Sequence, residues 1–269
     1  MRLALLGGGT IARLVLEHLG ELGGIELVAL CGRRAGSPSA ALARSLSVPY
    51  VVGIEALRAA RPEVVLEAAS HDAVREQLVD LLQARISVVV LSAGALADDQ
   101  LRRRAEEAAR RSGALLYVPS GGIGGLDALK GACAAGVDEV SIEVAKPPAA
   151  WQDIAFVEAL RIELAALPAR ITLFDGPARE GVLHFPQNVN IAAALALAGV
   201  GFDRTRLRAV ADPALTHNTH TVEVRGRSGR FRIVLENVPS PENPKTTVLA
   251  CYSALAALHE LVSRARYGT

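Results

Sequence analysis

The stretch that decides the fold stands at the start of the chain: Leu3-Ala4-Leu5-Leu6-Gly7-Gly8-Gly9-Thr10-Ile11-Ala12. Its four leading apolar residues predict a buried parallel strand, and the apolar residues between 11 and 19 recur with the period of a helix. The turn between them has the pattern G-x-G-x-x-A. Gly7 permits the tight turn, Gly9 lets a pyrophosphate approach the backbone, and Ala12 lets the helix pack on the strand. Because free amides at a helix start hold phosphates, the stretch predicts a dinucleotide-binding site.

Composition narrows the class of protein. The chain has 269 residues, of which 51% are hydrophobic, enough for two modest domains or one large one. Its formal net charge of +1 gives no electrostatic reason to expect a nucleic acid or a membrane surface as partner. The longest apolar run, residues 191–202, is shorter than the ~20 residues that a membrane-spanning helix needs.

The three cysteines, Cys31, Cys133 and Cys251, are too few and too scattered for a disulfide framework or a thiolate metal site. The first residues also lack the basic and apolar regions of a secretory leader. Both features predict a protein of the reducing cytoplasm.

Strand-like runs alternate with helical patterns in the first half of the chain, which predicts βαβ units and a parallel sheet. The strand-like runs cover residues 25–30, 63–68, 86–91 and 114–118, and the helical patterns cover 72–82 and 98–112. Ligands of such sheets lie beyond the carboxyl ends of the strands, so we expect Ala69 and Ser92 beside the cofactor. His71 also follows a strand end, where we expect it to cap a helix rather than to touch the cofactor.

The cofactor type depends on the residues that follow the second strand. A unit that prefers NAD usually carries Asp or Glu there, to bind the ribose 2′-hydroxyl. This chain has Arg33 and Arg34 instead, where a 2′-phosphate would lie. The pair favours NADP or dual use, unless both are ordinary loop arginines, so the cofactor is predicted as NAD or NADP.

The pattern changes at about residue 137. Apolar and polar residues alternate over 140–145, which predicts a half-exposed strand of a different sheet. Residues 171–174 predict another strand, and 221–225 with 231–235 predict a hairpin. The helix expected at 190–197 is apolar nearly all round, so it should be buried.

These patterns predict an α/β protein with two domains. The first is a Rossmann domain with a doubly wound parallel sheet, formed by residues 1–119 and completed by a C-terminal helix, residues 240–269. The second is an α+β domain, residues 120–239, which would bind substrate.

Two segments of the second half concentrate polar side chains. Residues 185–190 place Asn188 and Asn190 at the start of the apolar helix, as caps or as ligand contacts. Residues 212–220 contain a pair of histidines, but no carboxylate or cysteine stands at the spacing of a metal ligand, so no metal site is expected.

The chain resembles the L-aspartate dehydrogenase family in segments spread from end to end. The matching segments are residues 7–12, 92–98, 119–127, 146–148, 174–180, 185–190, 212–220 and 235–244. The resemblance implies oxidative deamination of L-aspartate to iminoaspartate, with NAD(P) accepting hydride. The imine would feed NAD biosynthesis or hydrolyse to oxaloacetate and ammonia. It also implies a homodimer whose interface is the sheet of the second domain.

The resemblance also assigns site residues. The family's active-site histidine, in its N-x-H element, falls on His220, and two of its cofactor contacts fall on Gly122 and Asn190. Gly122 departs from the alanine more common there, which should keep a backbone contact and loosen the loop. The full set of expected cofactor-binding residues is Gly7, Gly9, Thr10, Ile11, Arg33, Arg34, Ala69, Ser92, Gly122 and Asn190.

The expected chemistry explains why a histidine is needed. Hydride leaves C2 of aspartate most easily from a neutral amine, whose lone pair stabilises the developing iminium. A histidine with a pKa near 6.5 can take the amine proton or activate the water that attacks the imine. His220 is the expected acid/base, with His217 as the second candidate.

The substrate's two carboxylates need cationic or amide partners. Lys146, Asn188 and Arg179 are candidates by position, together with His217, although for Arg179 a structural salt bridge is the favoured role.

Two other functions compete with this one. A related Rossmann reductase could act on another amino or hydroxy acid, of the homoserine or dihydrodipicolinate type. A non-catalytic NAD(P)-binding protein could keep the fold without the chemistry, although the joint presence of His220, Asn188 and Asn190 argues against that loss.

Overall fold

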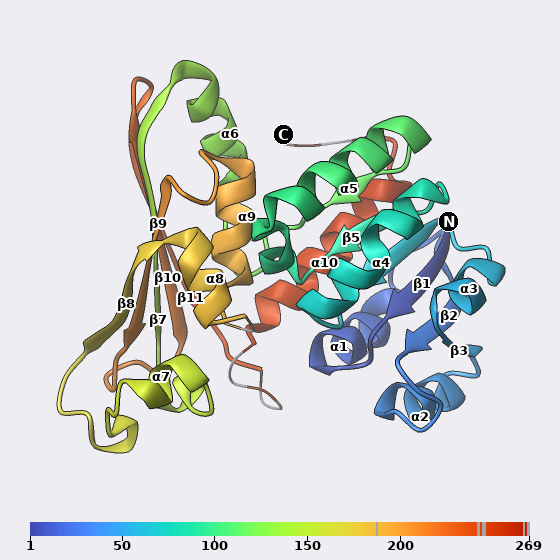
Figure 1. Ribbon diagram of the computed structural model, residues 1–269, viewed down its shortest axis with the longest axis horizontal. Helices are drawn as coiled ribbons and strands as arrows, with labels where there is room; N and C mark the ends of the chain where they lie inside the picture. The colour runs from blue at the N-terminus through green and yellow to red at the C-terminus, as the bar shows by residue number, and fades with distance from the viewer. Residues whose placement is uncertain (187, 241–242, 244–245, 266, 268–269) are drawn as a thin grey trace. The chain divides into compact units, whose positions relative to one another are not determined.

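The computed structural model describes residues 1–186, 188–240, 243, 246–265 and 267. Within it the chain forms two compact units (Figure 1). The first consists of Met1–Pro119 together with the part of the C-terminal helix that begins at Cys251, and the second consists of Ser120–Ala250. Some residues of the matching segments named above, and of the C-terminal segment 240–269, lie outside the described residues: Gln187, Pro241, Glu242, Pro244, Lys245, Arg266, Gly268 and Thr269.

The first unit is built on a six-stranded parallel sheet in the order β3-β2-β1-β4-β5-β6. Its strands are β1 (Arg2–Leu6), β2 (Glu26–Gly32), β3 (Tyr50–Val52), β4 (Val64–Glu67), β5 (Ser87–Val90) and β6 (Leu116–Tyr117). The strand order reverses between β1 and β4, which is the point where dinucleotides bind in such sheets. The predicted Rossmann sheet is therefore confirmed.

Helices cover this sheet on both faces. They are α1 (Thr10–Leu19), α2 (Pro38–Ser45), α3 (Ile54–Ala59), α4 (His71–Gln83), α5 (Asp99–Ser112) and α10 (Val248–Val262), with a short 3-10 helix η1 (Ala93–Ala97). One core joins Leu3 and Leu5 of β1 to Val15 of α1 and Leu258 of α10. Figure 1 shows α4 and α5 side by side, in agreement with their contacts.

The second unit is built on a mixed sheet in the order β11-β10-β7-β9-β8. Its strands are β7 (Val137–Lys146), β8 (Ile171–Pro177), β9 (Thr205–Ala211), β10 (Asn218–Gly226) and β11 (Gly229–Asn237). β7 and β9 are parallel and the other neighbours are antiparallel. The predicted hairpin is β10–β11, which pairs Gly226 with Gly229 at its turn.

Helices of the second unit pack on the strands of this sheet (Figure 1). They are α6 (Leu126–Ala135), α7 (Ala155–Ala159), α8 (Ala178–His184) and α9 (Asn190–Ala198), with 3-10 helices η2 (Pro148–Trp151) and η3 (Leu164–Ala166). Side chains alternate along β10: Asn218, His220 and Val222 are buried, whereas Glu223 and Arg225 are exposed. This alternation places His220 inside the unit.

The expectation for His71 is wrong. His71 is the first residue of α4, and the cap is the preceding residue, Ser70, whose hydroxyl accepts a hydrogen bond from Ala73 N. A serine hydroxyl on a short side chain reaches the first-turn amides from the N-cap position, which is one residue earlier than His71.

No helix among the described residues combines the length and the apolar character needed to cross a membrane.

Candidate active site

His220 lies on β10, which is flanked by β7 and β11. Its partners across the sheet are Val144 on β7 and Leu235 on β11. The residue is 1% exposed. A polar ring in such apolar surroundings needs hydrogen-bond partners, and these decide what it can do chemically.

One carbonyl oxygen fixes the tautomer of this ring. Gly122 O lies 2.8 Å from His220 Nδ1 and 2.9 Å from Asn237 Nδ2, and the two nitrogens are 3.0 Å apart. A carbonyl oxygen only accepts hydrogen bonds, so this network assigns the proton of the neutral ring to Nδ1, which donates to Gly122. Asn237 donates to the second lone pair of the same oxygen.

The other ring nitrogen is left unprotonated. His220 Nε2 is buried and has no hydrogen-bond partner among the described residues. An unsatisfied buried acceptor costs free energy, and such groups in native structures are often kept for a ligand or for catalysis. Nε2 is therefore the atom at which a substrate proton can be taken up.

The surroundings keep this ring neutral. Burial and, to a smaller extent, the positive charge of Lys146 lower the pKa of His220, the hydrogen bond to Gly122 opposes both, and the net pKa is about 3. The expected pKa near 6.5 is therefore wrong for the ligand-free protein, because that value belongs to a solvated imidazole. The consequence is a base that is unprotonated throughout the physiological pH range.

Lys146 and Asn188 form the second part of the site. Lys146 ends β7, is 1% exposed, and lies 5.5 Å from the ring centroid of Trp151. Its Nζ donates to Asn188 O at 3.3 Å, and Asn188 Nδ2 donates to Ala150 O at 2.9 Å. Lys146 and Asn188, both predicted to bind substrate, are thus in contact, and the charge of Lys146 also acts on His220.

Gly122 has no room for a larger side chain, because Thr247 lies against it. An added Cβ would lie 2.6 Å from Thr247 Oγ1 and 3.4 Å from His220 Cε1. Thr247 is 5% exposed and pairs with Pro239 in an isolated bridge. The threonine hydroxyl occupies the space that an alanine methyl would need.

The second unit holds three further residues that were named from the sequence. His217 is exposed, and its Nδ1 lies 2.9 Å from Thr216 Oγ1. Asn190 is the first residue of α9 and is partly buried. Arg179 Nε lies 2.6 Å from Asp203 Oδ1, which confirms the predicted salt bridge.

The first unit offers a phosphate cradle. Gly7 has φ +109°, and a Cβ there would lie 2.5 Å from Ala68 O, so glycine is required. Gly9 precedes α1, and a Cβ there would meet nothing within 4 Å. The first amides of α1, from Thr10 and Ile11, have no acceptor within the helix. Open space above these amides suits the pyrophosphate of a dinucleotide.

The two arginines expected at the adenosine ribose follow β2 and are exposed. Arg33 Nη2 donates to Ser70 Oγ at 3.0 Å, and Arg34 O accepts from Tyr50 Oη at 2.8 Å. The Arg33 guanidinium therefore reaches Ser70, the residue that caps α4.

The backbone amides of Ala69 and Ser92 both donate to Glu67, a residue that the sequence patterns did not single out. Glu67 Oε1 accepts from Ala69 N at 2.8 Å, and Glu67 Oε2 accepts from Ser92 N at 2.9 Å. The sequence signal that could have identified Glu67 is a single carboxylate in an otherwise apolar strand. Asn237 was missed as well, although it stands in one of the matching segments.

Within the described part of the chain, no group of three or more His, Cys, Asp and Glu residues has the geometry of a metal site.

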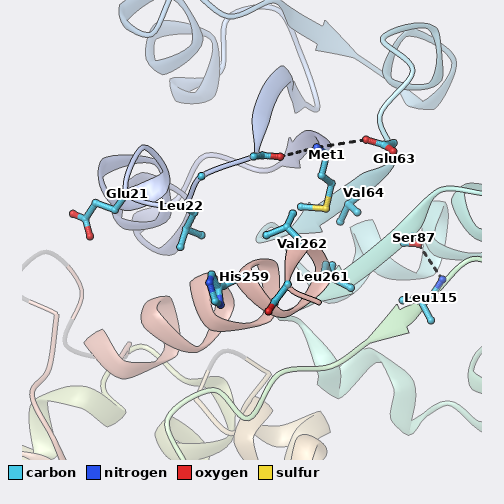
Figure 2. A pocket seen from close by; sticks show the side chains of 13 residues that line it. Met1, Glu21, Leu22, Glu63, Val64, Ser87, Leu115, His259, Leu261 and Val262 are labelled. Carbon is cyan, nitrogen blue, oxygen red and sulfur yellow. Dashed lines mark hydrogen bonds and ion pairs between the residues drawn. The ribbon is translucent and has the colours of Figure 1, made fainter. Parts of the chain in front are cut away.

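A cavity of about 740 Å³ in the first unit lies away from the cradle (Figure 2). Its lining includes Met1, Val64, Ser87 and Leu115, which stand at or just before the N-terminal ends of β1, β4, β5 and β6. Because cofactors bind beyond the carboxyl ends of parallel strands, this cavity is not the expected cofactor site.

Comparison with known proteins extends over the whole chain. The family model for the C-terminal domain of aspartate dehydrogenase matches residues 127–261, and the model for the NAD-binding domain of homoserine dehydrogenase matches residues 7–119. The L-aspartate dehydrogenase of Methanosarcina acetivorans is 40% identical and covers 100% of both chains. L-aspartate dehydrogenase 2 of Bordetella pertussis is 41% identical over 99% of each chain.

A solved structure agrees with these sequence relationships. The crystal structure of aspartate dehydrogenase from Thermotoga maritima is 28% identical, has a TM-score of 0.76, and covers 100% of this chain and 99% of its own. The buried histidine, the phosphate cradle and these full-length similarities lead to one assignment: the chain belongs to the aspartate dehydrogenase family.

Proposed function

We propose that this chain catalyses the NAD(P)-dependent oxidative deamination of L-aspartate to iminoaspartate, with His220 as the acid/base. The observation that carries the proposal is the buried, unprotonated and unbonded Nε2 of His220, within reach of the charge of Lys146. The names of the relatives, L-aspartate dehydrogenases that cover the whole chain, supply the substrate.

When bound, NAD(P)⁺ supplies an acceptor for the hydride that leaves C2 of aspartate. His220 Nε2 accepts a proton, either from the substrate ammonium before hydride transfer or from the water that attacks the imine afterwards. Both steps need the same tautomer, with Nδ1–H donating to Gly122 O. The iminoaspartate then hydrolyses to oxaloacetate and ammonia, or leaves for NAD biosynthesis.

Lys146 and Asn188 are proposed to bind the substrate carboxylates. A dicarboxylate beside Lys146 would offset the positive charge that depresses the pKa of His220, so substrate binding itself would make Nε2 more basic. His217 is the weaker member of this set, because its Nδ1 already pairs with Thr216.

The proposed cofactor contacts are the cradle at Gly7, Gly9, Thr10 and Ile11, the turns at Ala69, Ser92 and Gly122, Asn190, and the two arginines. Exposed guanidinium groups at Arg33 and Arg34 support acceptance of NADP as well as NAD.

A homodimer through the outward face of the second sheet is also proposed. Side chains of both charges line a hollow of about 450 Å³ on this face, including the pairs Arg170–Glu143 and Arg206–Asp175. Mixed charges of this kind can pair across a two-fold axis. Sedimentation equilibrium would show twice the chain mass, and a monomer at all concentrations would contradict the proposal.

Cytoplasmic location is proposed from the cysteines, because Cys31, Cys133 and Cys251 are all free thiols.

The decisive assay measures reduction of NAD and NADP by purified protein with L-aspartate, against L-glutamate, L-homoserine and no substrate. Aspartate-dependent reduction with release of ammonia is expected, and the ratio of the two cofactor rates tests the role of the arginines. Turnover of another substrate instead of aspartate would favour a related reductase. Cofactor binding with no turnover of any amino acid would favour a non-catalytic protein.

His220→Ala is expected to leave NAD(P) binding intact and to lower kcat by about 10²–10⁴, the usual contribution of a positioned acid/base. His259→Ala is the matched control, since His259 is exposed and belongs to α10 of the first unit. Near-normal turnover by the His220 variant would refute the assignment.

A further inference from the structure

Glu67 is a buried carboxylate in a position where an aliphatic residue would be expected. It is the last residue of β4, an interior strand between β1 and β5, and it is 1% exposed. The other residues of this strand are Val64, Val65 and Leu66, all buried. Burying a charge in such a place costs free energy unless hydrogen bonds or an opposite charge compensate it, or the charge serves a function.

Within the described part of the chain Glu67 accepts four hydrogen bonds, and all four come from neutral donors. Oε1 accepts from Ala69 N at 2.8 Å, Ser70 N at 3.0 Å and Ser92 Oγ at 2.9 Å, and Oε2 accepts from Ser92 N at 2.9 Å. Each of these partners donates, an arrangement that suits the ionised carboxylate, which only accepts. Burial raises the pKa of the Glu67 carboxyl, and these bonds oppose it. Neutral donors hold the anion in place without cancelling its charge.

The position of Glu67 in the sheet places this charge near the expected site of the nicotinamide half of the cofactor. A Cβ on Gly7 would lie 2.5 Å from Ala68 O, so the pyrophosphate turn packs directly against the residue after Glu67. A dinucleotide lies across the reversal between β1 and β4, with its adenosine ribose at the end of β2. The nicotinamide half therefore belongs to the ends of β4 and β5, where Glu67 gathers the turns 68–70 and Ser92.

We propose that the buried anion of Glu67 makes this site bind the oxidised nicotinamide cofactor more tightly than the reduced one. The oxidised ring carries a positive charge and the reduced ring is neutral, while the rest of the dinucleotide is the same. Unit charges about 10 Å apart, at an effective dielectric of about 20, shift an equilibrium by roughly tenfold. The inference rests on the proposed cofactor but not on the proposed substrate.

Calorimetric titration of the full-length protein with NAD⁺ and NADH, and with NADP⁺ and NADPH, tests the proposal. In Glu67→Gln the ratio of Kd for the reduced form to Kd for the oxidised form should fall by about tenfold, mainly because the oxidised form binds more weakly. Glu63→Gln is the matched control, since it makes the same change at the exposed residue just before β4, at the opposite end of the strand. Its ratio should stay that of the wild type. Equal weakening of both forms by Glu67→Gln would reduce Glu67 to a structural role and overturn the proposal.

A second measurement does not depend on the folding of the Glu67 variant. ADP-ribose shares everything with NAD⁺ except the nicotinamide ring. In the wild type, NAD⁺ should gain more affinity over ADP-ribose than NADH does, and an equal or smaller gain would overturn the proposal. Both titrations are made without aspartate, so a protein that binds the cofactor but does not oxidise aspartate would contradict the proposed function alone. Failure to bind any of these dinucleotides would overturn both.

Discussion

At the scale of single residues, three groups decide what His220 can do before substrate arrives. Gly122 O holds the proton on Nδ1, Asn237 holds Gly122 O, and Lys146 adds its charge to the effect of burial. The ring is thereby kept neutral, with Nε2 available as a base. A solvated histidine would reach the same protonation state only above its ordinary pKa, and it would share the proton between two tautomers.

Asn237→Ala tests this arrangement. Loss of one hydrogen bond to Gly122 O, worth about 1 kcal/mol, should lower kcat about five- to tenfold while KM for aspartate changes little. The ¹⁵N chemical shifts of His220 should change from one tautomer to a mixture, which a purely structural loss would not cause. Glu236→Gln, at the exposed neighbouring position on β11, is the control. An unchanged kcat with a single tautomer would show that Asn237 does not position the ring.

At the scale of elements, the glycine-rich turn at 119–125 and the bridge between Pro239 and Thr247 fit together at Gly122. A methyl group there would lie 2.6 Å from Thr247 Oγ1, well inside contact distance. Gly122→Ala should therefore destabilise the protein by about 1–3 kcal/mol. Thr247→Ala in the same chain should recover most of that loss, because it removes the colliding hydroxyl.

A double-mutant cycle on unfolding free energies checks this fit. The two substitutions should couple by at least about 1 kcal/mol. Additive effects would mean that the turn moves aside at no cost, as expected for a loosened loop.

Elements with strong local signals could be predicted from the sequence. Helix α5 spans Asp99–Ser112, close to the predicted 98–112, because Asp98 caps its start and Gly113 ends it with a positive φ. Strand β9 carried no such signal: its outward Arg206 and Arg208 suggest a solvated segment, and only their pairing with Asp175 on β8 shows why they belong to a strand.

The candidate site was likewise predictable only where a local sequence pattern marks it. His220 could be found from a short motif, whereas its contacts with Asn237 and Gly122 join residues 17 and 98 positions away. Contacts over such separations depend on the packed sheet and leave no local pattern. The pKa of His220 could not be predicted for the same reason, since burial and Lys146 act only in the folded unit.

At the scale of the whole molecule, the neutral state of His220 links stability to pH. The unfolded chain takes up a proton on this ring near pH 6.5, whereas the native ring, with a pKa of about 3, does not. The contribution of His220 is therefore fully present above pH 6.5 and is lost as the pH falls toward 3. Between pH 7.5 and pH 5 the unfolding free energy should drop by about 2 kcal/mol from this group alone.

Urea unfolding of the wild type and of His220→Gln measures that contribution. Trp151 is the one tryptophan of the sequence and is fully buried in the unit that contains His220, so its fluorescence follows the relevant transition. Other titrating groups, including Glu67 with its pKa shifted upward, are present in both proteins and cancel in the difference. The wild type should therefore lose about 2 kcal/mol relative to the variant between pH 7.5 and pH 5. The exposed substitution His259→Gln should leave the difference from wild type constant. Parallel curves for wild type and His220→Gln would mean that the native ring titrates like a solvated imidazole, and the buried neutral base would have to be abandoned.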